Sequence, residues 1–125
     1  MKLDGSLYTI LDEIPAETGA DYRLRLDPGH IIYQAHFPGA PITPGVCLMQ
    51  MGLELSQRCF GHPLKLQCVS QVKFLKTIVP SRTPLLLFSL RTRPAEEGRR
   101  KVQALITAEG ETYVKMTFLF NEENL

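Results

Sequence analysis

The chain has 125 residues, 44% of them hydrophobic and 22% charged, which are ordinary proportions for one folded domain and exclude a disordered chain. Lys and Arg number 14 and Asp and Glu 13, a balance that gives no reason to expect nucleic acid or an anionic membrane as the main partner. No apolar run approaches the ~18 residues of a membrane span, and the N-terminus lacks a signal-peptide pattern. The 3 cysteines form no CxxC pair and suit a reducing cytoplasm. We therefore expect a single cytoplasmic domain over residues 1–125.

Alternation of apolar and polar residues predicts β-strands over much of the chain. The candidate strands are 7–11, 22–26, 64–74, 86–90, 102–108 and 114–120. In the segment 64–74 every second residue is apolar or small. The residues between them are polar, with Val69 as the exception. Turn-forming pairs separate the last four strands, at Pro80-Ser81, Glu97-Gly98 and Glu109-Gly110. These short connections predict that the four strands form an antiparallel meander.

One segment between the strands predicts a helix over residues 46–60. Thr43 is a candidate N-cap, Pro44 suits the first turn, and Gly61 would end the helix. The segment is apolar almost all round, which is typical of a buried helix. Its polar side chains have spacings that place them on one face, namely Gln50, Glu54, Gln57 and Arg58. We therefore expect a buried helix with one polar stripe, near the rim of the domain or at a subunit contact.

The segment from His36 to Gly45 holds three prolines and two glycines in ten residues. Such a composition predicts a rigid, tightly turned loop, and it leads directly into the helix. His36 would then lie near the helix N-terminus, where free N–H groups and the helix dipole favour negative charge. Gly45 would let a ligand approach that backbone closely. The pattern suits a general base beside an oxyanion site, and a structural histidine is the alternative.

The other candidate residues have simpler interpretations. Cys47, in the first helical turn, is either a nucleophile paired with His36 or a small packed residue, which is the better interpretation. His30 and His62 flank turns and have no cysteine or carboxylate at ligand spacing, so we expect solvated side chains and no metal. The phenylalanines of the strands are core candidates that can border an acyl tunnel: Phe74, Phe88, Phe118 and Phe120.

The segment from His36 to Val46 closely resembles the active-site stretch of the 3-hydroxyacyl-acyl carrier protein dehydratases of bacterial fatty acid synthesis. The segments 31–35, 72–76 and 79–80 extend this resemblance. It implies an α+β hot-dog fold, in which an antiparallel sheet wraps around a long central helix. It also implies a homodimer, a trimer of dimers, or a heterodimer with a homologous subunit. The substrate would be carried on the phosphopantetheine of acyl carrier protein or of coenzyme A, with no metal or other cofactor.

The resemblance also implies a reaction and the residues that perform it. A (3R)-3-hydroxyacyl thioester would lose water and become the trans-2-enoyl thioester, in a fatty acid or related polyene or lipid pathway. His36 would take the proton from C2. The backbone at Gly45 and Val46 would bind the thioester, with the Gly45 N–H at its oxygen. Phe37 and Phe74 are the candidates for the wall of the acyl tunnel.

One position departs from this family. The family has a carboxylate on the central helix, fourteen residues after the histidine, and that position is Gln50 here. A glutamine amide cannot donate a proton as an acid does. Glu54 lies one helical turn later, so Glu54 could supply the acid instead. Alternatively, His36 and Gln50 could serve a thioesterase, or the chain could be a degenerate subunit whose partner supplies the carboxylate. A non-catalytic, acyl-binding role is the remaining alternative.

Overall fold

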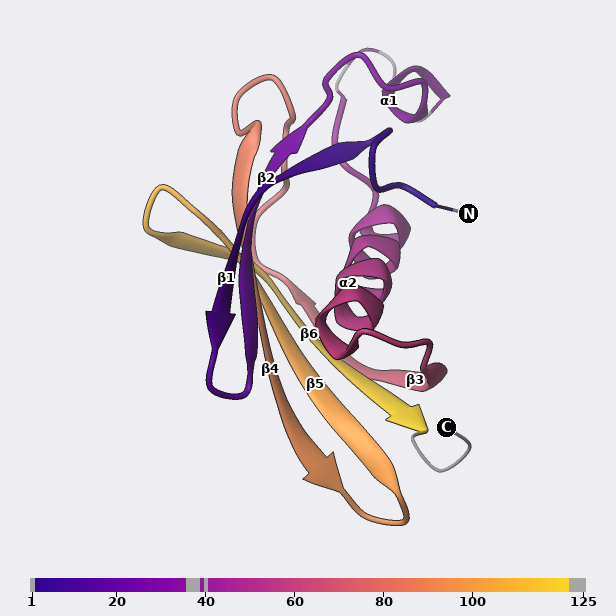
Figure 1. The fold of residues 1–125 in the computed structure, drawn as a ribbon. Helices are drawn as coiled ribbons and strands as arrows, with labels where there is room; N and C mark the ends of the chain where they lie inside the picture. Colours follow the sequence, from indigo (N-terminus) through magenta and orange to yellow (C-terminus); the bar gives the residue numbers. More distant parts are fainter. Residues whose placement is uncertain (1, 36–38, 40, 122–125) are drawn as a thin grey trace.

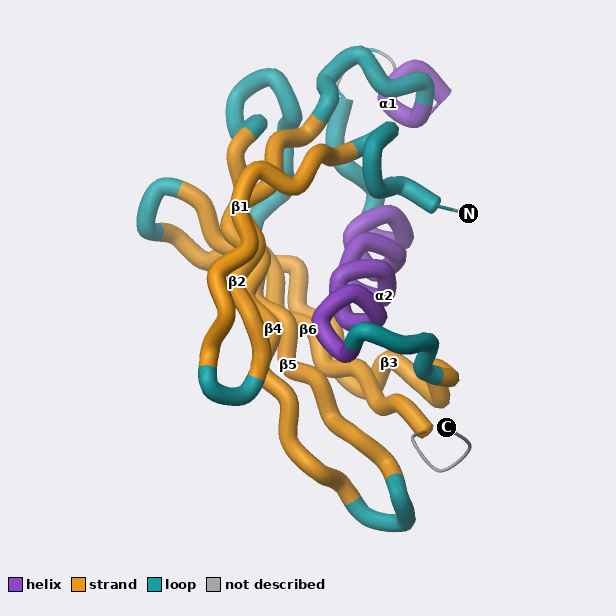
Figure 2. The backbone as a smooth tube through the Cα atoms, in the orientation of Figure 1, coloured by secondary structure: helices purple, strands orange, loops and turns teal. Residues whose placement is uncertain are grey.

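The structure is a computed structural model that describes residues 2–35, 39 and 41–121. The elements in chain order are β1 (Tyr8–Ala16), β2 (Gly19–Leu26), α1 (Ile32–Ala35), α2 (Gly45–Phe60), β3 (Lys65–Phe74), β4 (Leu85–Ala95), β5 (Arg99–Ala108) and β6 (Glu111–Asn121). Within these residues the strands form one antiparallel sheet in the order β1-β2-β4-β5-β6-β3. The sheet curves around α2, which lies on its concave side (Figures 1 and 2). This α+β arrangement confirms the predicted fold class.

The predicted meander is correct for β4, β5 and β6 but wrong for β3. The turn residues before β5 and β6 have positive φ angles, 60° at Glu97 and 52° at Glu109, each followed by a glycine that also has positive φ. Such pairs suit tight hairpins between twisted strands. β3 instead lies at the far edge of the sheet and pairs with β6. The connection 75–84 is long enough to lead from that edge back to β4 in the middle of the sheet.

The strict alternation predicted for β3 is also wrong, because two register shifts interrupt its pairing with β6. They lie between Leu66 and Cys68 and between Val69 and Gln71. Each shift inserts an unpaired residue, so the inward positions fall three residues apart. Leu66, Val69 and Val72 are therefore half-buried and Cys68 is exposed. Val69, the exception to the sequence pattern, is one of the inward residues.

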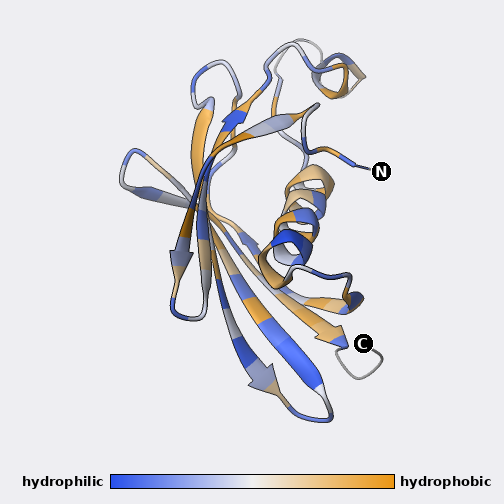
Figure 3. Cartoon of the chain, in the orientation of Figure 1, coloured by the Kyte–Doolittle hydropathy of each residue, from blue (hydrophilic) through white to orange (hydrophobic). Residues whose placement is uncertain are grey.

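The core fills the space between α2 and the concave face of the sheet. Met51 and Leu55 of α2 are fully buried, and so are the three phenylalanines Phe88, Phe118 and Phe120. The backbone of α2 approaches the sheet closely at Gly52, where an added Cβ would lie 2.6 Å from the Phe118 ring. These three rings confirm the expected core, whereas Phe74 is 53% exposed and lies outside it. Figure 3 shows the hydrophilic bands that interrupt the otherwise hydrophobic α2.

The ends of α2 agree with the sequence prediction only in part. The helix begins at Gly45, and its N-cap residue, Pro44, makes no side-chain cap. The predicted cap at Thr43 is wrong, because its buried hydroxyl shares a hydrogen bond of 2.9 Å with the Tyr33 hydroxyl. Gly61 ends the helix as predicted, with a left-handed φ of 76°.

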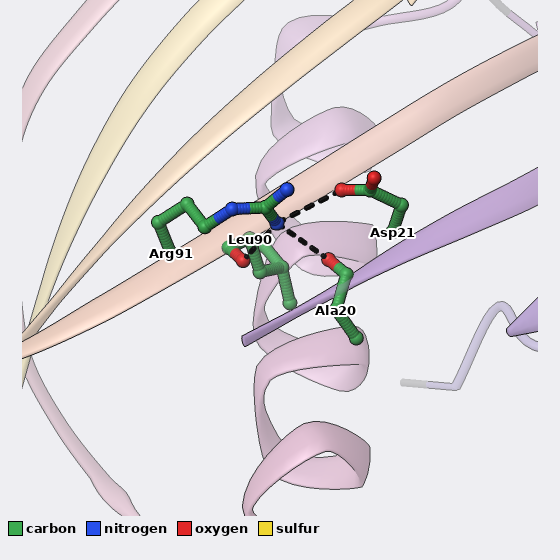
Figure 4. Close-up of polar contacts among 4 residues, drawn as sticks. All are labelled: Ala20, Asp21, Leu90 and Arg91. Atoms are coloured by element: carbon green, nitrogen blue, oxygen red, sulfur yellow. Dashed lines mark hydrogen bonds and ion pairs between the residues drawn. The ribbon is translucent and has the colours of Figure 1, made fainter. Parts of the chain in front are cut away.

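A junction between β2 and β4 fixes the first half of the sheet against the second. Nη1 of Arg91 donates to a carboxylate oxygen of Asp21 at 2.9 Å and to the backbone carbonyls of Leu90 and Ala20 (Figure 4). The hydrogen bond from Arg91 to the Asp21 carboxylate holds the pKa of Asp21 below its ordinary value. At Gly19 the two strands are so close that a Cβ would overlap the carbonyl of Leu90.

Candidate functional site

His36 and Phe37, the predicted base and one predicted tunnel residue, lie outside the described residues. The segment that holds them is fastened at both ends. The hydroxyl of Tyr33, in α1, shares a hydrogen bond with Oγ1 of Thr43, just before α2. The Thr43 N–H in turn donates to the Ile78 carbonyl at 2.8 Å. Tyr33 and Thr43 are both buried. The two residues that flank the loop are therefore in contact inside the domain.

The N-terminus of α2 has backbone donors that its own structure does not use. The N–H groups of Cys47 and Leu48 donate to the Pro44 carbonyl. Among the described residues, the N–H groups of Gly45 and Val46 make no hydrogen bond. Free donors are normal in a first turn, but the proline N-cap also leaves them without a side-chain acceptor. Two adjacent N–H donors at the positive end of a helix suit a developing negative charge.

Phe74, the second predicted tunnel residue, packs against this helix N-terminus. A Cβ at Gly45 would lie 2.7 Å from Cζ of Phe74, so only glycine fits beneath the ring as it stands. Phe74 is 53% exposed, and the Val46 side chain is 65% exposed. The structure therefore brings Gly45, Val46 and Phe74 together, with exposed apolar surface beside the free N–H donors.

Glu54 is bound to the N-terminal segment of the chain. Its carboxylate accepts the backbone N–H of Leu3 at 2.7 Å and that of Asp4 at 2.8 Å. It also accepts the Tyr8 hydroxyl at 2.9 Å and the Gln50 side-chain amide at 2.9 Å. Four donors thus surround two carboxylate oxygens, so each oxygen accepts two hydrogen bonds from this chain.

Tyr8 has no role in the sequence prediction, yet it completes this cluster. Its ring is buried, and burial together with the hydrogen bond to Glu54 raises the pKa of its hydroxyl. The hydroxyl therefore stays protonated and donates to Glu54. No local sequence pattern reveals this contact, because Tyr8 and Glu54 are 46 residues apart.

The predicted polar stripe of α2 does lie on one face. All four of its residues line a pocket of about 420 Å³ together with Lys2 and Asp4. Nη2 of Arg58 contacts a carboxylate oxygen of Glu13 at 3.3 Å, and the Gln57 amide donates to the Leu64 carbonyl at 3.4 Å. The stripe is thus used largely to fasten neighbouring segments of the chain to the helix.

The remaining candidates are Cys47, His30 and His62, and their surroundings do not indicate a catalytic role. Cys47 is 1% exposed, and burial raises the pKa of its thiol, which argues against a nucleophile. Nδ1 of His30 accepts the N–H of Ile32 at the start of α1. His62 is exposed. In the described part of the chain no group of three His, Cys, Asp or Glu side chains could hold a metal ion, and no helix there is both long and apolar enough to cross a membrane.

The family model of the ApeI-like ApeI dehydratases matches residues 13–115. The chain belongs to the ApeI-like dehydratase family. The match extends from β1 to β6 and includes both the loop and the central helix. This finding confirms the resemblance to dehydratases that the loop sequence indicated. A search of curated proteins finds no match.

Solved structures confirm the hot-dog fold. The dehydratase heterocomplex ApeI:P from Xenorhabdus doucetiae has a chain that superposes with a TM-score of 0.68 at 19% identity, covering 90% of this chain and 96% of that one. A protein of the thioesterase superfamily gives a TM-score of 0.65 at 14% identity, covering 90% and 82%. The dehydratase domain from the CurK module of curacin polyketide synthase gives 0.57 at 14% identity, covering 93% and 43%. At these identities the likenesses establish the fold alone.

Proposed function

We propose that this chain is one subunit of a dehydratase that converts a (3R)-3-hydroxyacyl thioester on acyl carrier protein into the trans-2-enoyl thioester, and that a homologous subunit completes its active site. The proposal rests on the hydrogen bonds that the Glu54 carboxylate accepts. It is the one carboxylate in the α2 sequence, and four donors of its own chain surround it. An acid must also reach the leaving hydroxyl, and both oxygens of this carboxylate already accept hydrogen bonds from their own chain.

The chain's own residues would supply the base and the oxyanion site. His36 takes the C2 proton, and the electron pair of that C–H bond moves toward the thioester carbonyl. The Gly45 N–H, free of any hydrogen bond to a described residue, stabilises the charge on the thioester oxygen. The electron pair then returns to form the C2=C3 double bond as the C3–O bond breaks, and the hydroxyl leaves as water with a proton from a carboxyl group of the partner.

A heteromeric assembly would make the two sites of a dimer unequal. In the dehydratases that this loop resembles, the helix carboxylate faces the histidine of the other subunit. This chain's His36 would therefore face the partner's carboxylate, whereas the partner's histidine would face Gln50. General acid catalysis typically contributes ~10²–10⁴-fold, so one site would carry most of the turnover. The heterocomplex of the similar Xenorhabdus dehydratase supports such an arrangement.

The test is an assay of the purified chain, with a 3-hydroxyacyl thioester of acyl carrier protein, alone and together with a homologous subunit that has the carboxylate. We expect little dehydration by the chain alone and strong dehydration by the mixture. A His36→Ala chain in the same mixture should lose that gain. Full activity of the isolated chain would contradict the heteromeric site. Release of free thiol without enoyl product would indicate the thioesterase instead.

A matched pair of substitutions tests the assignment of Glu54. In the active mixture, Glu54→Gln should leave the pH dependence of kcat unchanged, because Glu54 is not the acid. Glu96→Gln, on the exposed turn before β5, controls for the loss of a charge. A loss of kcat of ~10²-fold or more in Glu54→Gln alone, in a folded protein, would restore Glu54 as the acid.

A further inference from the structure

One hydrogen bond joins the two ends of the loop whose sequence contains His36. The hydroxyls of Tyr33 and Thr43 lie 2.9 Å apart, and both residues are only 4% exposed. Tyr33 is three residues before His36, and Thr43 is two residues before Gly45. The same hydrogen bond therefore connects the chain just before the proposed base to the chain just before the proposed oxyanion donor.

Each end of the loop is also fastened to the rest of the domain. On the first side, the Asp27 N–H donates to the Leu7 carbonyl at 2.8 Å. On the second side, the Thr43 N–H donates to the carbonyl of the buried Ile78 at 2.8 Å. The hydrogen bond between Tyr33 and Thr43 links these two anchored segments inside the core. A buried hydroxyl that loses its partner is costly, so the two segments resist separation.

The relative position of the two loop ends matters for the proposed chemistry. The C2 proton and the thioester oxygen belong to groups on adjacent carbon atoms of the substrate. The base that takes the proton and the N–H that stabilises the oxygen must therefore keep a fixed separation. A misplacement of about 1 Å can lower a rate by about 10²-fold. Two apolar side chains could fill the same space, but a hydrogen bond also fixes distance and direction.

We propose that Tyr33 and Thr43 are positioning residues, whose hydrogen bond holds the loop ends so that His36 and the Gly45 N–H act on the substrate together. This inference rests on the proposed function, which gives His36 and Gly45 their roles. Neither hydroxyl transfers a proton in the reaction. Burial raises the pKa of the Tyr33 hydroxyl, so it stays neutral near pH 7.

The activity test uses the mixture of this chain with the homologous subunit. Tyr33→Phe leaves the Thr43 hydroxyl buried without its partner, so the urea midpoint should fall. In this variant kcat should fall about tenfold while KM stays unchanged, because only the placement of the reacting groups is disturbed. The double variant, Tyr33→Phe with Thr43→Val, lacks both hydroxyls and keeps both shapes. Its urea midpoint should return toward that of the unchanged protein, whereas its kcat should remain low.

Two further measurements separate positioning from other roles. Tyr22→Phe is the matched control, because Tyr22 is also a fully buried tyrosine but lies on β2. It should keep the kcat of the unchanged chain. The pH profile of kcat/KM in Tyr33→Phe should keep its midpoint and lose only height. A shifted midpoint would mean that Tyr33 takes part in the proton transfer, and this would contradict a positioning role.

NMR of the isolated full-length chain tests the inference without turnover. Tyr33→Phe retains an aromatic ring, so changes in chemical shift report changes in position. We expect the His36 ring signals and the Gly45 amide signal to move in Tyr33→Phe and in the double variant. Both sets of signals should stay in place in Tyr22→Phe.

Unmoved signals, or a kcat that returns to normal in the double variant, would overturn the inference. Recovery of kcat together with stability would mean that the two hydroxyls serve the fold alone. If the signals move but the unchanged chain shows no dehydration in the mixture, the proposed function fails. In that case the positioning of the loop by Tyr33 and Thr43 stands.

Discussion

The side-chain amide of Gln50 donates to a carboxylate oxygen of Glu54 at 2.9 Å, across one turn of the central helix. The two residues occupy successive positions on the polar stripe, and the helix geometry alone brings them within reach. The amide therefore belongs to the same cluster that binds the N-terminal segment to α2. Several consequences can be measured.

Glu54→Gln should lower the free energy of unfolding by about 2–3 kcal/mol. One carboxylate oxygen becomes an amide nitrogen, which cannot accept the two hydrogen bonds that this oxygen accepts now, one of them from the N–H of Leu3 or of Asp4. Urea denaturation measures the loss, and hydrogen exchange should be faster at one or both of these amides. Exchange rates that equal those of the unchanged protein would mean that Glu54 does not hold this segment.

Gln50→Glu should place two carboxylates in contact at the site of the present 2.9 Å hydrogen bond. Mutual repulsion would raise the pKa of the pair in the folded state above its unfolded value of about 4.3. The variant should therefore be most stable below that pH, relative to the unchanged protein, and lose stability as the pH rises. Denaturation at pH 4 and pH 7 measures this. A strong gain of dehydration by the isolated variant would show that Gln50 was the missing acid position.

Gly45→Ala should impair thioester turnover while changing stability by less than about 1 kcal/mol. The new Cβ meets the far end of the Phe74 ring, and this half-exposed ring has room to move. Alanine also favours the helix. The methyl group would nevertheless crowd the approach to the backbone N–H, so kcat/KM should fall at least about tenfold. Thermal melting provides the control, and unchanged kcat/KM in a folded variant would contradict the oxyanion role.

Gly19→Ala should destabilise the fold by more than about 3 kcal/mol. Its Cβ would overlap the Leu90 carbonyl, and a backbone atom in a paired strand cannot move aside. Gly39→Ala is the matched control, because a Cβ there meets nothing within 4 Å. Similar urea midpoints for the two variants would mean that β2 and β4 separate easily.

Asp21→Asn should reduce the sensitivity of the protein to acid. Arg91 lowers the pKa of Asp21 in the folded state, so the carboxylate contributes stability above its unfolded pKa of about 3.9. That contribution is lost as the pH falls through the lowered value. The unfolding free energy of the variant should therefore depend less on pH below about 4. An identical pH profile would mean that the ion pair is screened by solvent.

The sequence predicts those elements that depend on neighbouring residues. The central helix follows from its apolar run and from Gly61, and the last hairpins follow from Glu-Gly pairs whose φ angles are positive. The bulges of β3 are not predictable, because they depend on its pairing with β6. The Thr43 hydroxyl could serve as a cap locally, but the tertiary contact with Tyr33 takes it instead.

Prediction of the site is limited by sequence distance. Gly45 and Phe74 come from a helix start and a strand end, and each is recognisable alone, but their contact is tertiary. The partners of Glu54 are more remote still, since the Leu3 N–H is 51 residues away. A glutamate at position 54 could equally serve as a catalytic acid or as a residue that binds the N-terminal segment to the helix. The donors that surround the Glu54 carboxylate are visible only in the folded chain.

Both outer strands of the sheet have irregular registers. β1 shifts between Ile10 and Asp12, and β3 shifts twice. An edge with regularly spaced backbone groups is a template onto which unrelated chains can add and aggregate. Bulges disturb that spacing and increase the local twist. In the proposed heteromeric dehydratase, we therefore expect these irregularities to keep the unassembled subunit from pairing with unrelated chains.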